Sequence, residues 1–310
     1  MSGPEPVWWI ILGGLLLAAA GYWLAAPRTL LRLEFSRLRR RARARVRRVV
    51  LASGEVAYLT AGQGDGAPVL YLHGFTGMKE NWLPLMAAMG HATIQYAPDL
   101  PGWGESERRD EHAHDFASQA ERLVAFIDTA IGRPVDLVGH SMGGGVAAVL
   151  AARHPDRIRR LVLVDAAGVR FADNPFGLAV LAGENPFAVV DVAGFERFLA
   201  LVFECPPRVP PRIARWLVRR RLADAPFEQR VLEAIGRGPG AFLPEREATG
   251  IRAATLLLWC REDRVVDSSA AGIYAAIIPG SRTVLLDGCG HMPMMENTAA
   301  MAAALKEFLQ

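Results

Sequence analysis

Short apolar runs alternate with longer amphipathic stretches along the chain after Gly54. Six of these runs are rich in β-branched and aliphatic residues and are apolar on both faces: 69–74, 92–99, 135–140, 161–166, 255–260 and 283–288. Helical periodicity lies between or after them, most clearly at 116–131, 144–153 and 298–309. This alternation predicts an α/β fold, in which helices flank a mainly parallel sheet.

The alternation stops between residues 168 and 249. No strand-like run occurs in this segment, and nine prolines interrupt its short amphipathic stretches. A segment of this length is too long for a structureless loop. It therefore predicts a helical lid over 168–249 at the edge of the sheet, inserted between two parts of the core at 49–167 and 250–310.

The predicted lid is rich in aromatic residues, because eight of the thirteen phenylalanines lie in it. Phe195 and Phe198 are three residues apart, so they share one face of the helix expected over 193–203. We expect these two side chains to bind an apolar substrate. Their alternative role is to form the core that any helical lid needs.

The first 27 residues are strongly apolar. Residues 7–26 carry no charge and would be about 30 Å long as a helix, which matches the hydrocarbon core of a bilayer. A cleaved signal peptide is the alternative, but such peptides begin with positive residues and none precedes this run. The pattern predicts a transmembrane anchor over 1–27. Gly14, Ala18 and Gly21 share one face of it, a spacing that favours a homodimer through the anchor.

A basic segment follows the anchor. The whole chain carries +3, but residues 28–48 hold ten arginines and one glutamate, so they account for +9 and the rest sums to −6. An apolar stripe at Leu31, Phe35, Leu38 and Ala42 predicts a basic amphipathic juxtamembrane helix over 28–48 that lies at the headgroup level. A stop-transfer charge cluster without a helical role is the alternative.

The basic segment also bears on partners and location. Anionic lipids attract each cation near the surface by roughly 1 kcal/mol, which favours membrane lipids as the partner. No aromatic platform or recognition motif accompanies the arginines, so we expect no nucleic-acid partner. Because basic flanks tend to stay cytoplasmic, the pattern predicts a single-pass anchor, in the inner membrane if the source is a bacterium, with the following domain in the cytoplasm.

The three cysteines, Cys205, Cys260 and Cys289, are scattered through the chain without pair spacing. Their spacing predicts neither a disulfide framework nor a zinc site.

The residues Gly139-His140-Ser141-Met142-Gly143 follow a predicted strand and precede a predicted helix. A G-x-S-x-G motif in that context is typical of a nucleophile elbow, a tight turn that exposes a serine hydroxyl. We therefore predict Ser141 as a nucleophile. The start of the following helix offers the backbone N–H of Met142 to a developing oxyanion, and the N–H of Phe75 after another strand is the expected second donor.

A serine hydroxyl needs a base, and the elbow order requires an acid and then a histidine downstream. His291 follows the last predicted strand and is the only histidine after His154. Three carboxylates follow the preceding strand: Glu262, Asp263 and Asp267. We favour Asp263 as the orienting acid, because it stands where that strand has just ended.

The segments "LHGF", "GHSMGG", "REDRVVD" and "GCGHMPMME" together resemble the α/β-hydrolase superfamily over residues 50–310. With the anchor, "LHGFTGMKENW" and "VVDSSAAGIYAAI" are more closely similar to membrane-anchored monoacylglycerol lipases and bacterial phospholipases A. The resemblance implies the α/β-hydrolase fold, a triad of Ser141, Asp263 and His291, and an oxyanion hole of Phe75 and Met142. It also implies a membrane-bound serine carboxylic ester hydrolase of glycerolipids that uses no metal or cofactor.

Three alternatives stay open at this point. A C–C bond hydrolase and a general short-chain esterase have the same fold and the same triad. A non-catalytic membrane receptor is the third, although receptors of this fold usually lack a triad member. The phenylalanine-rich lid favours the lipid substrate.

Overall fold

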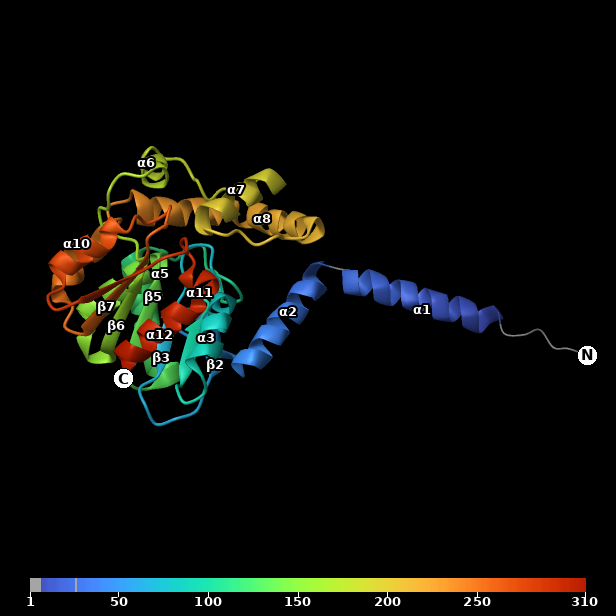
Figure 1. Cartoon of the computed structure of the whole chain (residues 1–310), viewed down its shortest axis with the longest axis horizontal. Coiled ribbons are helices and arrows are strands. Elements are labelled where there is room, and N and C mark those ends of the chain that lie inside the picture. Colours follow the sequence, from blue (N-terminus) through green and yellow to red (C-terminus); the bar gives the residue numbers. More distant parts are fainter. Residues whose placement is uncertain (1–6, 26) are drawn as a thin grey trace, which may run out of the picture.

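Eight strands form one sheet in the order β1-β2-β4-β3-β5-β6-β7-β8 (Figure 1). The computed structural model describes residues 7–25 and 27–310. The strands are β1 (Arg45–Leu51), β2 (Gly54–Ala61), β3 (Val69–Leu72), β4 (Gln95–Pro98), β5 (Val135–His140), β6 (Ile158–Val164), β7 (Ala254–Cys260) and β8 (Arg282–Leu286). β1 and β2 form an antiparallel hairpin and β2 pairs antiparallel with β4, whereas β4, β3, β5, β6, β7 and β8 are parallel to one another.

The central strands are buried on both faces, and consecutive residues along each of them enter different cores. Leu137 and Leu257 belong to one hydrophobic cluster, and their neighbours Val138 and Leu258 belong to the other. The first cluster is covered by α4 (Phe116–Phe126), α5 (Met142–Arg153) and α10 (Ser269–Ile277), and the second by α3 (Leu83–Met89) and α12 (Thr298–Leu309). The continuous apolar runs of the sequence therefore follow from a sheet that has helices on both sides.

Residues 168–249 join β6 to β7 and contain four α-helices and no strand: α6 (Pro175–Leu181), α7 (Val192–Val202), α8 (Pro211–Gly236) and α9 (Leu243–Glu247). We call this segment the helical insert. Figure 1 shows α6, α7 and α8 together on one side of the sheet. Side chains cap the N-termini of α6 and α7. Asn174 accepts a hydrogen bond from the N–H of Gly177, and Asp191 accepts one from the N–H of Gly194.

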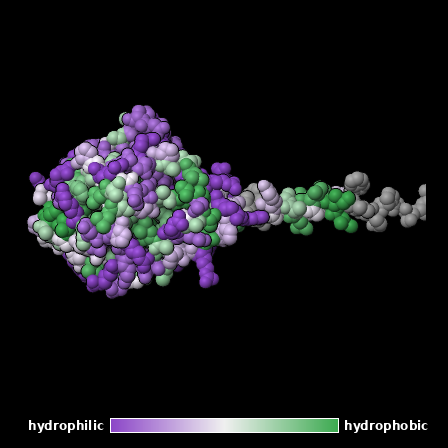
Figure 2. Space-filling model, turned by 90° about the horizontal axis from the view of Figure 1, so that it is seen from above, coloured by the Kyte–Doolittle hydropathy of each residue, from purple (hydrophilic) through white to green (hydrophobic). Residues whose placement is uncertain are grey.

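Two helices precede the sheet, α1 (Val7–Ala25) and α2 (Pro27–Ala42). Residues 1–6 and 26 of the predicted anchor lie outside the described residues. Figures 1 and 2 show α1 as a largely hydrophobic rod that extends from α2 away from the sheet. In the described part of the chain no single helix has the length and apolarity to cross a membrane. Trp9–Tyr22 and Pro27–Ala42, which are bent by 70° relative to each other, reach that length and apolarity only when taken together.

The prediction of one helix over 28–48 is wrong at its C-terminal end. α2 ends at Ala42, Arg43 has a left-handed φ of 48°, and Arg45 to Arg48 belong to β1. Pairing with β2 satisfies the backbone of these arginines, which helical periodicity alone does not detect. The apolar stripe is partly used within the protein, because Ala42 is buried in the second cluster and Leu38 packs against it.

The structure also corrects the prediction from cysteine spacing, because Cys260 and Cys289 form a disulfide with a Cα–Cα distance of 5.5 Å. Cys260 ends β7 and lies opposite Leu286 at the end of β8, so Cys289 follows only three residues later. The two cysteines are 29 residues apart in sequence, yet they meet because adjacent parallel strands end at the same edge. The disulfide joins the two loops that follow β7 and β8.

We predict that replacing both cysteines (Cys260→Ala with Cys289→Ala) lowers the free energy of unfolding by roughly 3 kcal/mol, because the crosslink restricts the unfolded chain. Urea unfolding with and without reductant measures the effect. Cys205→Ala is the matched control, since Cys205 is exposed and lies outside the disulfide. A wild-type unfolding curve that reductant leaves unchanged would contradict the crosslink.

Candidate active site

Ser141 occupies a strained turn between β5 and α5. Its backbone has φ 54° and ψ −121°, a conformation that L-residues rarely adopt. The flanking glycines are required by space: a Cβ on Gly139 would lie 2.4 Å from the carbonyl oxygen of Gly143, and one on Gly143 would lie 2.5 Å from that of His73. The turn therefore has the geometry expected of a nucleophile elbow.

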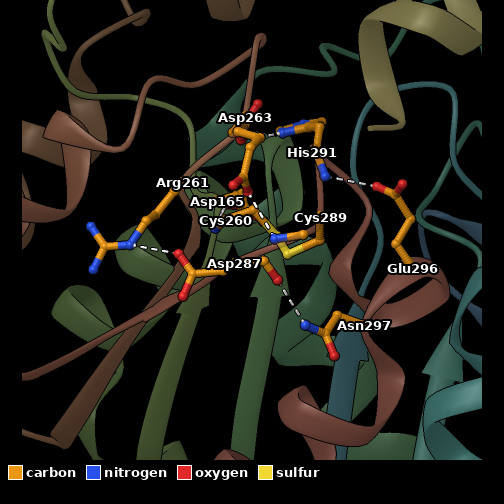
Figure 3. Close-up of a disulfide and its surroundings, with 12 residues drawn as sticks. Asp165, Cys260, Arg261, Asp263, Asp287, Cys289, His291, Glu296 and Asn297 are labelled. Carbon is orange, nitrogen blue, oxygen red and sulfur yellow. Dashed lines mark hydrogen bonds and ion pairs between the residues drawn. A yellow bond between two sulfur atoms is a disulfide. The ribbon is translucent and has the colours of Figure 1, made fainter. Parts of the chain in front are cut away.

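His291 and Asp263 are hydrogen-bonded to each other at the end of the sheet (Figure 3). His291 Nδ1 lies 2.7 Å from Asp263 Oδ2, and both side chains are buried. The other oxygen of Asp263, Oδ1, accepts hydrogen bonds from the N–H groups of Val265 at 2.7 Å and Val266 at 3.1 Å. Asp263 thereby orients the imidazole so that Nδ1 carries the proton and Nε2 is free to accept one. Ser141 and His291 line one cavity.

The other two candidate acids have different contacts. Glu262 accepts a hydrogen bond from the N–H of Gly288, and Asp267 accepts one from the N–H of Ser269 at the start of α10. Of the three carboxylates that follow β7, Asp263 is the one hydrogen-bonded to His291.

The two predicted oxyanion donors lie on either side of Ser141. Met142 is the first residue of α5, where backbone N–H groups have no partner within the helix. Phe75 follows Gly74, whose added Cβ would lie 2.8 Å from Ser141 Cβ, so the Phe75 loop passes close to the serine. Phe75, Met142 and Ser141 also line the same large cavity.

His73 holds the Phe75 loop in place. Its Nδ1 lies 2.8 Å from the carbonyl oxygen of Gly74, and its Nε2 accepts a hydrogen bond from the N–H of Leu100. Burial lowers the pKa of His73, so the ring is neutral and keeps an acceptor nitrogen.

His140, which precedes Ser141, contacts the backbone of His291, and the sequence analysis did not predict this contact. Its Nε2 lies 2.6 Å from the backbone carbonyl oxygen of His291, and the two ring centroids are 4.7 Å apart. Burial, followed by the nearby His291, lowers the pKa of His140 well below its usual range. A neutral His140 can donate this hydrogen bond without adding charge beside His291. The position of His140 in the motif gives no signal for this contact.

Two cavities meet at Ser141. The larger has a volume of about 380 Å³ and is walled mainly by apolar side chains of the helical insert, including Phe176, Val180, Leu232 and Ile235. The smaller, of about 160 Å³, contains His291 and the polar side chains of Thr76 and Asn81. Phe75 and Phe187 line both cavities.

The two phenylalanines predicted to bind substrate are placed differently. Phe198 lines the smaller cavity. Phe195 is buried behind it, with its ring stacked on that of Phe198 at a centroid distance of 6.4 Å, and it belongs to neither cavity wall. The helical spacing that put both on one face does not distinguish a first layer of side chains from a second.

The fold and these residues define a class of protein, and the profile of the Alpha/beta hydrolase family matches residues 69–304. The chain belongs to the α/β-hydrolase family, which confirms the resemblance of its motifs to the lipases and esterases of that superfamily.

Similar proteins include lipases from animals and bacteria. Monoacylglycerol lipase abhd6-B of Xenopus laevis is 28% identical over 306 residues, which cover 95% of this chain and 90% of that protein. Lipase 1 of Psychrobacter immobilis is 27% identical over 269 residues, covering 85% of this chain and 83% of that protein.

Solved structures give the same class. A membrane phospholipase A described as a bacterial virulence factor has a TM-score of 0.89 and 34% identity, covering 98% of both chains. A meta-cleavage product hydrolase from Pseudomonas fluorescens has a TM-score of 0.71 at 23% identity, covers 84% of this chain and 96% of that one, and shares the fold.

We predict that Ser141→Ala abolishes ester hydrolysis and covalent labelling by a fluorophosphonate, because only an activated hydroxyl reacts with that probe. Asp263→Asn should lower kcat by roughly 10⁴-fold, since the imidazole loses the partner that fixes its tautomer. Asp267→Asn is the matched control and should have little effect. Labelling that survives in Ser141→Ala, or a larger loss in Asp267→Asn than in Asp263→Asn, would show that the roles are assigned wrongly.

Proposed function

We propose that this protein is a membrane-bound serine carboxylic ester hydrolase that acts on glycerolipids. The observation that carries the proposal is the cavity of about 380 Å³ that begins at Ser141 and is walled by apolar side chains of the helical insert. We propose that the insert is a lid whose cavity takes the acyl chain. The smaller cavity, with its polar groups beside His291, would take the glycerol side of the ester.

In the proposed mechanism, Ser141 Oγ attacks the ester carbonyl while His291 Nε2 accepts its proton. The N–H groups of Phe75 and Met142 donate to the oxyanion, and loss of one such donor typically costs about 3 kcal/mol of transition-state stabilisation. His291 then protonates the leaving alcohol, which leaves an acyl group on Ser141. Water, deprotonated by His291, releases the fatty acid. These steps require no metal or cofactor.

Membrane attachment is part of the same proposal. α1 would span the bilayer, and the small residues Gly14, Ala18 and Gly21 on its surface would allow a homodimer through the anchor. Disulfides persist in oxidising compartments. The Cys260–Cys289 disulfide therefore favours a catalytic domain outside the cytoplasm, opposite to the side expected from the arginines.

The relatives support the lipid substrate over the alternatives. A monoacylglycerol lipase is similar to this chain over 95% of its length, and a membrane phospholipase A over 98%. The meta-cleavage product hydrolase shares the fold over a smaller part of this chain, 84%. A short-chain esterase would not use the depth of the larger cavity, and a receptor would not need the hydrogen bond between Asp263 and His291.

We predict that the rate of hydrolysis increases with acyl chain length until the larger cavity is filled. Each buried methylene contributes about 0.8 kcal/mol, or roughly fourfold in kcat/KM. A series of esters from acetyl to palmitoyl, dispersed in detergent, measures the profile. Val180→Trp should move the maximum to shorter chains, because Val180 lines the cavity on α6.

Leu178→Trp on the same helix is the matched control, since Leu178 is 52% exposed and points away from the cavity wall. Its profile should equal that of the wild type. A flat profile, or a preference for acetyl esters in detergent, would rule out the glycerolipid substrate and leave a general esterase.

A further inference from the structure

Positive charge is concentrated in two segments that are far apart in the sequence. Residues 28–48 account for +9, and residues 208–221, which contain six arginines and no acidic residue, account for +6. Because the whole chain carries +3, the remaining residues sum to −12. The second basic segment covers the N-terminal half of α8 in the helical insert.

The fold brings these two segments together. α2 packs against α8, as well as against α3. Figure 1 shows the N-terminal end of α8 close to the N-terminal end of α2, where α1 ends. The basic half of α8 therefore lies beside the point where the proposed anchor leaves the domain.

The arginines of α8 lie on one face of the helix. Arg212, Arg215, Arg219 and Arg220 are exposed, and their spacing places them on one side together with Trp216. The guanidinium of Arg220 lies 5.2 Å from the centre of the Trp216 ring. Residues of the opposite side are buried or paired: Ala214, Val218 and Arg221, which is bonded to Glu228.

We propose that α2 and the N-terminal half of α8 form one basic surface that binds the anionic phospholipid headgroups of the bilayer in which α1 is anchored. This inference rests on the proposed membrane attachment. Arginines around a half-buried tryptophan are typical of an interfacial helix, in which the ring lies at the headgroup level. The occupant is a lipid surface because two arginine-rich helices in contact with each other, α2 and α8, lie beside the proposed anchor.

The proposed surface is connected to the active site through one helix. Leu232 and Ile235, in the C-terminal half of α8, line the larger cavity. Binding of the N-terminal half to headgroups therefore holds a wall of the acyl cavity at the bilayer surface, where glycerolipids enter.

A fluorescence experiment tests the contact independently of activity. The full-length chain carries Cys205→Ser and Trp216→Cys, is labelled at position 216 with an environment-sensitive dye, and is reconstituted in vesicles. We expect the emission to shift to shorter wavelength as phosphatidylglycerol replaces phosphatidylcholine, and to return with added salt. The same label on Arg252→Cys, before β7, is the control and should not respond. An unresponsive label at 216, or equal responses at both positions, would overturn the proposal.

A second experiment uses charge-matched variants. One carries Arg212→Gln, Arg215→Gln, Arg219→Gln and Arg220→Gln. The other carries glutamine at four exposed arginines around the amino ends of the parallel strands, Arg133, Arg159, Arg252 and Arg282. The readout is hydrolysis of monoacylglycerol in vesicles, divided by each variant's rate on a soluble short-chain ester. In phosphatidylglycerol vesicles we expect this ratio to be about tenfold lower for the α8 variant than for the wild type. The variant changed at the amino ends of the strands should have the same ratio as the wild type.

Equal losses in the two variants would mean that net charge matters and that the α8 surface does not. If the wild type fails to hydrolyse vesicle lipids while the protein labelled at position 216 still responds to phosphatidylglycerol, the proposed function fails and the proposed surface stands.

A different observation concerns Asp165, a fully buried carboxyl that the mechanism above does not use. It follows β6, has a left-handed φ of 44°, and accepts a hydrogen bond at Oδ1 from the N–H of Cys260. Within the described chain no donor group forms a hydrogen bond with its other oxygen, Oδ2, which is also buried. Figure 3 shows Asp165 beside Asp263, and one of its oxygens lies within 4.8 Å of ring nitrogens of both His140 and His291.

Two buried carboxyl groups this close do not both ionise. Asp263 accepts three hydrogen bonds, from His291, Val265 and Val266, which stabilise its charged form. Asp165 accepts only one, from Cys260. Burial, followed by the charge of Asp263, raises the pKa of Asp165 well above its usual range. The other facing groups are the neutral His140 and the imidazole of His291.

We propose that Asp165 is a positioning residue that stays protonated and donates a hydrogen bond from Oδ2 to the carboxylate of Asp263. The proton satisfies the orphaned oxygen, and the bond holds Asp263 in line with His291 Nδ1. The inference concerns the triad and does not depend on the substrate.

The test compares two substitutions on a soluble ester. Asp165→Asn keeps a donor at the same place, so kcat should stay within about threefold of the wild type, with the acid limb of the pH profile unmoved. Asp165→Leu removes the donor, and kcat should fall roughly tenfold or more at unchanged KM. If Asp165 is ionised instead, Asp165→Asn removes a negative charge near His291 and the acid limb moves down by about one pH unit. That shift, or equal losses in both variants, would overturn the proposal.

Discussion

Four parallel strands that end at the same edge of the sheet bring together four side chains of the candidate active site. Ser141, Asp165, Asp263 and His291 follow β5, β6, β7 and β8, respectively, and these strands are neighbours in that order. Because hydrogen bonding between the strands fixes their register, it also fixes the relative positions of the four side chains. Asp263 and His291 are 28 residues apart in sequence, yet their side chains are joined by a hydrogen bond of 2.7 Å.

The loops that carry these residues are held by contacts that do not react. The disulfide links the loop after β7, which carries Asp263, to the loop after β8, which carries His291 and is called the histidine loop here. His140, at the end of β5, is hydrogen-bonded to the backbone carbonyl oxygen of His291. Glu296 accepts hydrogen bonds from the N–H groups of Gly290 and Cys205, and so ties the histidine loop to the end of α7. Separate parts of the chain thus support Asp263, His291 and Ser141, the proposed acid, base and nucleophile, as a site that must keep its geometry requires.

Local patterns predicted the parts of the structure that depend on local physics. The strands follow from apolar runs buried on both faces, and the elbow follows from glycines that the turn requires. The errors all involve contacts between distant segments. The end of α2 depends on pairing of β1 with β2, and the disulfide depends on the register of β7 with β8. The position of Phe195 behind Phe198 likewise depends on packing that helical spacing does not specify. Asp165 looks like any residue that follows a strand until Asp263 is placed beside it.

The disulfide makes the structure of the site depend on the oxidation state of two thiols. When Cys260 and Cys289 are reduced, the loops that carry Asp263 and His291 are joined by noncovalent contacts, including the hydrogen bond between these two side chains. Pairing of β7 with β8 in the observed register brings Cys260 and Cys289 to a Cα–Cα distance of 5.5 Å, which favours the disulfide. The redox poise of the surroundings therefore decides whether the loops after β7 and β8 are covalently joined.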